Sequence, residues 1–212
     1  MRVCAIVPQK SLALAKGRLR VVLRPEARAA LSLRFLRIVC GALRASPGVE
    51  QLIVMTPDPR VLAEAGAWGV RAVFDPRPEV NAALAAVLAA RVSRTHAALI
   101  VAGDLPLLRP ADIAGLLSAV DSGALGVAPA KDGTGTNALL IPAGVLFRPA
   151  YGDGSLAAHR RLGRALGLRI VEVARPGLAF DVDTPEDLAA LGSARSIGSR
   201  GLDAMTLSAW RI

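Results

Sequence analysis

Short runs of aliphatic and β-branched residues alternate along this chain with longer segments whose apolar residues recur at helical spacing. In residues 25–45, for example, Leu31, Phe35 and Ile38 share one helical face, and Pro47-Gly48 ends the segment. Such alternation predicts an α/β fold in which helices cover both faces of a mostly parallel sheet. The runs predicted as strands are residues 2–7, 51–55, 70–74, 97–102, 125–129, 138–141, 169–173 and 178–182.

The length of 212 residues suits one domain with a substantial core. We assign residues 1–192 to that domain and expect residues 193–212, rich in Gly and Ser, to form a flexible C-terminal tail. No apolar run approaches the roughly 18 residues that indicate a membrane span, and the apolar part of the N-terminus is too short for a secretory signal. We therefore predict a cytoplasmic protein with no membrane partner.

The chain is strongly basic, with a net charge of +9, and arginine supplies all its basic residues except Lys10, Lys16 and Lys131. A positive electrostatic field favours anionic partners such as nucleotides, phosphorylated acids or nucleic acid, but the net charge does not distinguish among them. Aromatic residues make up only 3% of the chain, which is unlike a nucleic-acid binder that works by base stacking.

The most informative segment is Asp-Val-Asp-Thr-Pro-Glu-Asp-Leu at residues 181–188, predicted as the end of a strand that runs into a helix. Asp181 and Asp183 then point the same way, because residues i and i+2 of an extended chain share a face. Thr184 is the expected N-cap, with Asp187 as its partner. Carboxylates at this edge of a parallel sheet suit Mg²⁺ shared with substrate phosphates. The alternative is an ordinary helix start with acidic residues in its first turn.

The loop after the first predicted strand carries three cations within nine positions, Lys10, Lys16 and Arg18. Phosphate-binding loops need cations and free backbone N–H groups at such a strand exit. The loop matches neither the P-loop pattern nor the Gly-rich dinucleotide-binding pattern. A solvated basic loop is the alternative interpretation.

Asp104 follows the buried run at residues 97–102, and a carboxylate at the tip of a central strand is costly to bury unless it is paired or metal-bound. Its alternative role is that of a turn residue. Together with Asp181 and Asp183 it makes three carboxylates at strand ends, a set suited to one or two Mg²⁺ ions.

Three further segments offer polar groups to a ligand. The loop at residues 132–137, Asp-Gly-Thr-Gly-Thr-Asn, carries more hydroxyls and amides than a hairpin turn requires. Ser155 opens a helix after a Gly-rich turn, where an anion is favoured. Asn81 is expected as an N-cap or as a contact to a nucleobase or ribose. His159 has no metal-ligand partners in the sequence and is expected at the surface or behind a ligand-contacting residue.

In order and combination these segments resemble the CofC/FbiD family, guanylyltransferases that attach GMP to a small phosphorylated three-carbon acid in coenzyme F(420) biosynthesis. The resemblance extends from residue 3 to about residue 191. The segments that carry it are residues 6–19, Gly-Asp-Leu-Pro-Leu-Leu at 103–108, residues 132–139, Gly-Asp-Gly-Ser at 152–155 and residues 181–188. Two positions depart from the family pattern, Gln9 and Gly17, and both lie in the first loop.

The resemblance implies a single-domain, Rossmann-like nucleotidyltransferase fold related to sugar-nucleotide transferases. It also implies a role for each candidate residue. The implied contacts to the GTP phosphates are Lys10, Lys16 and Arg18. We assign Lys16 and Arg18 to the catalytic set as well, because either of them could neutralise the leaving pyrophosphate. The implied Mg²⁺ ligands are Asp104, Asp181 and Asp183, and Asp104 also belongs to the catalytic set. The implied contacts to the phosphorylated acid are Thr136, Gly152 and Ser155, and Asn81 faces the nucleotide.

The expected partners are therefore GTP, a phosphorylated three-carbon acid and a downstream transferase that takes an unstable product. Phosphoenolpyruvate is the favoured acid, and 2-phospho-L-lactate and 3-phospho-D-glycerate stay open. A homodimer also stays open, whereas nucleic acid is not expected. Two other functions compete with this one. The first is a nucleotidyltransferase of the same fold that acts on a molybdopterin or sugar phosphate, and the second is a basic, non-catalytic nucleic-acid-binding protein.

Overall fold

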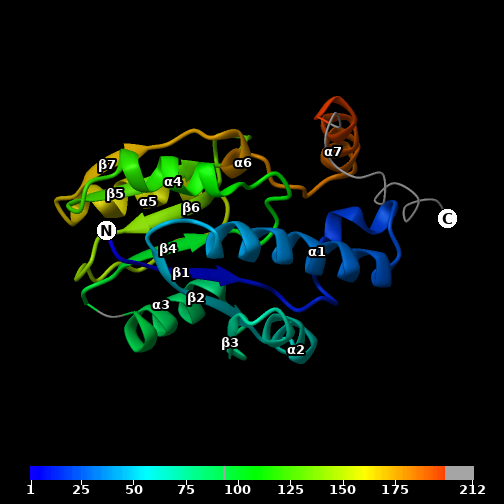
Figure 1. Ribbon diagram of the computed structural model, residues 1–212, viewed down its shortest axis with the longest axis horizontal. Helices are drawn as coiled ribbons and strands as arrows, with labels where there is room; N and C mark the ends of the chain where they lie inside the picture. The colour runs from blue at the N-terminus through cyan, green and yellow to red at the C-terminus, as the bar shows by residue number, and fades with distance from the viewer. Residues whose placement is uncertain (93, 199–212) are drawn as a thin grey trace.

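The computed structural model describes residues 1–92 and 94–198. In this part of the chain seven strands form one sheet, in the order β3-β2-β1-β4-β6-β5-β7 (Figure 1). The strands are β1 (Val3–Pro8), β2 (Val49–Thr56), β3 (Arg71–Phe74), β4 (Ala97–Val101), β5 (Ala124–Pro129), β6 (Thr136–Ile141) and β7 (Arg169–Glu172). Neighbouring strands pair in parallel except around β6, which is antiparallel to both β4 and β5. The prediction of a mostly parallel sheet is confirmed.

Helices cover both faces of the sheet, as predicted. One face packs against α1 (Pro25–Arg44), α2 (Pro59–Ala67), α4 (Pro110–Ala119) and α6 (Pro176–Ala179). The other face packs against α3 (Val80–Arg91) and α5 (Ser155–Ala165). Residues of β1 alternate between the two cores, with Ala5 in the first and Ile6 in the second, and both are fully buried. This two-sided burial explains why the strands read as continuous apolar runs in the sequence.

A smaller cluster lies beyond the carboxyl end of the sheet. Leu19, from the 3-10 helix η1 (Gly17–Val21), packs with Phe35 of α1 and with Val182, just before α7 (Pro185–Gly198). Through this cluster, the first loop and the acidic segment are both anchored to α1, although they are about 165 residues apart in sequence. No helix in residues 1–92 and 94–198 is long and apolar enough to cross a lipid bilayer.

The predicted strand at residues 178–182 is wrong. Pro176 instead starts the short helix α6, and residues 180–184 follow as unpaired extended chain. Proline is favoured at the first helical position because its fixed φ suits a helix and its missing N–H is not needed there. Gly177 fits this turn because a Cβ atom there would lie 2.1 Å from Oδ2 of Asp112. The apolar run thus divides between a helical turn and an extended segment.

The predicted domain boundary at residue 192 falls inside α7, which continues to Gly198. The helix therefore occupies the first six positions of the predicted tail. The rest of the tail, residues 199–212, lies outside the described residues, so its flexibility stays a prediction.

Candidate active site

A cavity of about 870 Å³ opens at the carboxyl edge of the parallel strands. Its wall includes the ends of β1, β2 and β4, and β6 enters from the opposite direction, so Thr136 at its start reaches the same edge. Open α/β sheets bind ligands at this edge, where neighbouring connections diverge to opposite sides. Seven of the predicted site residues line the cavity: Lys10, Lys16, Arg18, Asp104, Thr136, Gly152 and Asp183.

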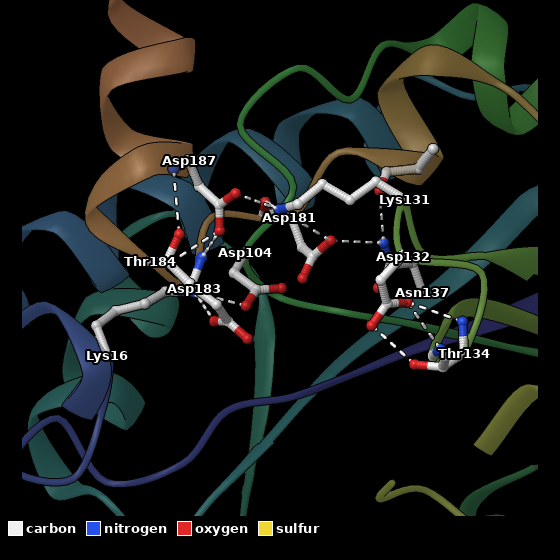
Figure 2. A network of polar contacts seen from close by, with 12 residues as sticks. Lys16, Asp104, Lys131, Asp132, Thr134, Asn137, Asp181, Asp183, Thr184 and Asp187 are labelled. Carbon is white, nitrogen blue, oxygen red and sulfur yellow. Dashed lines mark hydrogen bonds and ion pairs between the residues drawn. The ribbon is translucent and has the colours of Figure 1, made fainter. Parts of the chain in front are cut away.

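Lys16 lies at the centre of the charged wall. Its Nζ atom is 2.6 Å from Oδ2 of Asp104 and 3.1 Å from Oδ1 of Asp183, and only 6% of its side chain is exposed (Figure 2). Burial by itself would lower the pKa of Lys16, but the two carboxylates outweigh burial and raise its pKa. The ammonium group therefore stays charged and joins β4 to the acidic segment before α7.

The backbone of Lys16 is held in an unusual conformation. It is the one non-glycine residue of the described chain with positive φ, at 52°. Such left-handed geometry costs about 1–3 kcal/mol and persists where surrounding contacts enforce it. Two contacts anchor the loop before it: Asp58, the N-cap of α2, accepts the N–H of Leu12 at 2.8 Å, and Arg28 of α1 donates to the carbonyl of Ala15 at 2.8 Å. The strained turn directs the lysine toward the carboxylates rather than into solvent.

Asp183 is fixed by the start of α7, and here the sequence prediction is confirmed. Thr184 precedes the helix and Pro185 is its first residue. The Asp187 carboxylate accepts the N–H groups of Asp183 and Thr184, each at 2.9 Å, and the N–H of Asp187 donates to the Thr184 hydroxyl at 3.3 Å. Burial alone would raise the pKa of Asp187, but Lys131 and these N–H groups lower its pKa to about 2. The reciprocal hydrogen bonds between Thr184 and the charged Asp187 therefore fix the segment that carries Asp183.

Asp181 lies beside this cluster and has a different set of partners (Figure 2). Its Oδ1 atom is 3.6 Å from Nζ of Lys131 and accepts from Nδ2 of Asn137 at 3.4 Å, and Lys131 also donates to the Asp181 carbonyl. Burial raises the pKa of Asp181, Lys131 opposes that rise, and the negative charge of Asp104 adds to it. Asp181 and Asp104 thus interact as like charges across the site.

The carboxylate oxygens of Asp104, Asp181 and Asp183 are ligands of the type that Mg²⁺ prefers in proteins. Within the described residues, no group of three or more His, Cys, Asp and Glu side chains is placed to hold a metal by itself. Mg²⁺ is commonly bound by one or two carboxylates, with substrate phosphates and water completing the shell. The repulsion between Asp104 and Asp181 is relieved by a cation, and Lys16 supplies one on the Asp104 side. The pair of Asp104 with Asp183 or Asp181 is therefore compatible in chemistry with a Mg²⁺ site of this kind.

The opposite wall of the cavity carries the groups expected to meet the acid. Thr136 and Gly152 line the cavity, and Ser155 lies directly behind them, where its hydroxyl accepts the backbone N–H of Thr136 at 3.0 Å. The first N–H groups of α5 are already used, since Ser155 donates to Gly152 and Leu156 donates to Thr134. Ser155 therefore braces Thr136 in this structure.

The expectation of Asn81 as an N-cap is wrong, because Asn81 lies inside α3 and Glu79 is the N-cap. Asn81 is not among the residues that line the cavity, and it holds the turn before α5. Its side-chain amide donates to the carbonyl of Tyr151 at 2.9 Å, and its amide oxygen accepts the N–H of Tyr151 at 2.7 Å. The loop at 132–137 is likewise stabilised from within, because the Asp132 carboxylate accepts from the backbone N–H and the hydroxyl of Thr134. Of the polar side chains in that loop, Thr136 is the one that lines the cavity.

Sequence reasoning missed one buried carboxylate of the cavity. Asp75 follows β3, is 5% exposed and pairs with Arg77, whose Nη1 atom lies 2.6 Å from its Oδ2 atom. Both residues line the cavity. The strand-end reasoning that singled out Asp104 applies equally to Asp75, so the signal was present in the sequence.

With this geometry in place, the comparison with known proteins decides the family. The sequence model of the family described as "Guanylyl transferase CofC like" matches residues 3–193. This chain belongs to that family. It is 40% identical over 203 residues to the phosphoenolpyruvate guanylyltransferase of Rubrobacter xylanophilus, and the match covers 94% of this chain and 98% of that relative.

One relative carries a different acid in its name. The 3-phospho-D-glycerate guanylyltransferase of Phenylobacterium zucineum is 39% identical over 178 residues, which are 82% of each chain. Among solved structures, a nucleotidyl transferase from Methanothermobacter thermautotroptrophicus has a TM-score of 0.69 at 19% identity, and the match covers 93% of this chain and 99% of that one. That likeness confirms the nucleotidyltransferase fold.

Proposed function

We propose that this member of the guanylyl transferase family transfers GMP from GTP to the phosphate of phosphoenolpyruvate and releases pyrophosphate, as a step of coenzyme F(420) biosynthesis. The observation that carries the proposal is the cluster in which Lys16 joins Asp104 and Asp183 on the wall of the cavity. It sets a cation and carboxylates at the sheet edge where nucleotides bind. The name of the relative from Rubrobacter xylanophilus supports phosphoenolpyruvate as the acid.

The reaction is an in-line displacement at phosphorus. A phosphate oxygen of the acid forms a bond to the α-phosphorus of GTP, and the bond from that phosphorus to the oxygen bridging to the β-phosphate breaks. The pyrophosphate leaves with that electron pair. Because the attacking phosphate is already ionised at neutral pH, no side chain needs to remove a proton. The protein contributes orientation and charge neutralisation.

Residues on different sides of the cavity would neutralise charge and bind the acid. Lys10, Lys16 and Arg18 all lie on the side of the first loop, where their charges would neutralise the departing pyrophosphate. Thr136 and Gly152 lie on the side of β6 and the turn before α5, where they would contact the acid. Asp104, Asp183 and Asp181 would hold Mg²⁺, which supplies positive charge to the reacting phosphates.

The relatives support two acids, so the test offers each acid separately. Purified protein with GTP and Mg²⁺ is mixed with phosphoenolpyruvate, 2-phospho-L-lactate or 3-phospho-D-glycerate, and pyrophosphate release is measured with the downstream transferase present to remove an unstable product. We expect release with phosphoenolpyruvate, and loss of that release when Mg²⁺ is omitted. Release with 3-phospho-D-glycerate instead would support the acid named for the Phenylobacterium relative. Release with none of the acids would refute the proposed acceptors.

The competing functions have weaker support. Membership of the guanylyl transferase family disfavours a molybdopterin or sugar phosphate as the acceptor. A basic nucleic-acid binder would use the net charge of +9 but would leave Asp104 and Asp183 facing a polyanion. The cytoplasmic location, the downstream transferase and the homodimer stay predictions.

A further inference from the structure

His159 of α5 is a fully buried histidine with a fixed ring, which was expected from the sequence either at the surface or behind a ligand contact. The ring packs edge-on against Tyr151, with centroids 4.8 Å apart, and tilted against Phe147 at 6.1 Å. Each ring nitrogen has one polar neighbour: Nε2 is 3.0 Å from the backbone nitrogen of Ala150, and Nδ1 is 3.0 Å from the hydroxyl of Thr136. The alternative of a surface position is therefore wrong.

The direction of these two hydrogen bonds fixes the tautomer of the ring. A backbone N–H can only donate, so Nε2 must accept from Ala150 and cannot carry a proton. Burial also lowers the pKa of His159 to about 4, which keeps the ring neutral near neutral pH. A neutral imidazole that lacks a proton on Nε2 carries it on Nδ1. Nδ1–H therefore donates to the Thr136 hydroxyl oxygen.

This donation determines what Thr136 can do at the cavity. Its hydroxyl oxygen already accepts from His159, and its backbone N–H already donates to Ser155. Within the described residues, no hydrogen bond made by the Thr136 hydroxyl proton is found, and the residue lines the cavity. The hydroxyl therefore keeps its O–H donor and one acceptor lone pair, and accepting one hydrogen bond strengthens the next one that a hydroxyl donates.

We propose that His159 is a positioning residue that orients the Thr136 hydroxyl proton toward an anionic oxygen of the phosphorylated acid. The inference rests on the proposed function, because the acid must occupy the β6 side of the cavity. His159 itself does not touch the substrate. The donation from His159 occupies one lone pair of the Thr136 oxygen and so favours a hydroxyl proton turned away from the ring, as a carboxylate or phosphate oxygen of the acid requires.

The tautomer can be measured directly in the wild-type protein. The chain has two histidines, His96 and His159, so a ¹⁵N-histidine-labelled sample gives two sets of ring nitrogen signals, and the His96→Gln variant identifies those of His159. We expect His159 to show a protonated Nδ1 and an unprotonated Nε2 near neutral pH. A protonated Nε2 would overturn the proposal without any substitution at the site.

Two variants separate the functional and structural roles of the ring. In His159→Asn, the amide nitrogen takes the approximate place of Nδ1 and keeps the donor to Thr136. In His159→Gln, the longer side chain places its amide near Nε2 and keeps the acceptor for Ala150. We expect His159→Gln to raise KM for the acid about tenfold, the equivalent of one lost hydrogen bond. His159→Asn should stay within about threefold, and KM for GTP should change little in either variant.

A double-variant cycle then tests whether His159 acts through Thr136. Thr136→Val removes the hydroxyl at constant shape, and in that background His159→Gln should add no further rise in KM for the acid. Thr136→Ser keeps the hydroxyl, so its KM for the acid should rise less than that of Thr136→Val, and the comparison of these two variants tests the role of the hydroxyl if the His159 variants fold poorly. Equal effects of the Asn and Gln variants, full additivity, or a Thr136→Val variant with wild-type KM would each overturn the proposal. Failure of the proposed function looks different, because the wild-type protein would then release no pyrophosphate with any acid.

Discussion

Asp104→Asn is expected to lower kcat by about two to three orders of magnitude while the protein stays folded. Losing one preorganised charged group at a centre of developing charge typically costs that much. The change keeps the shape of the side chain but removes the charge that faces Lys16 at 2.6 Å and the charge that raises the pKa of Asp181. It also removes a carboxylate from the proposed Mg²⁺ site. Because Lys16 keeps its second partner, Asp183, and an asparagine oxygen can still accept from the lysine, we expect the protein to stay folded.

The control for this variant is Asp121→Asn. Asp121 is an exposed carboxylate that pairs with Arg169 at the opposite edge of the sheet, ahead of β5. Both variants change the net charge equally, so a long-range electrostatic effect would appear in both. Wild-type turnover in Asp104→Asn, or an equal loss in Asp121→Asn, would refute the role of Asp104.

Lys16→Met is expected to lower kcat by a similar or larger factor and to raise KM for GTP. The substitution removes the one cation that contacts both Asp104 and Asp183 in this structure, and it leaves those carboxylates without a counter-charge. It also removes a charge that would otherwise face the leaving pyrophosphate. Lys16→Arg should recover only part of the activity, because the strained backbone directs a lysine into a buried site and a planar guanidinium has a different shape.

Arg20→Met is the matched control for Lys16→Met. Arg20 is an exposed residue of the 3-10 helix η1, which Lys16 immediately precedes, and it does not line the cavity, so this variant removes one positive charge nearby without touching the cluster. Steady-state kinetics of both variants should separate a local contribution of Lys16 from the general basic field. Similar kinetics for the two would mean that Lys16 acts only through that field.

Much of this site was predictable because strand ends and caps depend on local sequence. The capping pair of Thr184 and Asp187 was predicted correctly, since it depends on residue types three positions apart. The shared edge of Lys16 and Asp104 was predictable from β-α alternation, because parallel strands end on one side of a sheet. These contacts are confirmed, and the catalytic roles of the residues stay predictions.

Other features depend on tertiary contacts that no local pattern specifies. The helix α6 starts at Pro176, but its fit against the rest of the fold depends on Gly177, which packs against Asp112, a residue 65 positions earlier in the chain. Asn81 makes its hydrogen bonds to the backbone of Tyr151, which lies 70 residues away in the chain. His159 could not be placed from sequence, because its partners Thr136 and Ala150 come from β6 and a loop.

The central claim is that GTP binds with its phosphates at the cluster of Lys16, Asp104 and Asp183, and the most direct test is a crystal structure with a non-hydrolysable GTP analogue and Mg²⁺. We predict a metal ion about 2.0–2.1 Å from an oxygen of Asp104, with Asp183 or Asp181 as a second ligand and Lys16 in contact with a phosphate oxygen. A nucleotide bound outside the cavity, or a metal held by none of these carboxylates, would contradict the account.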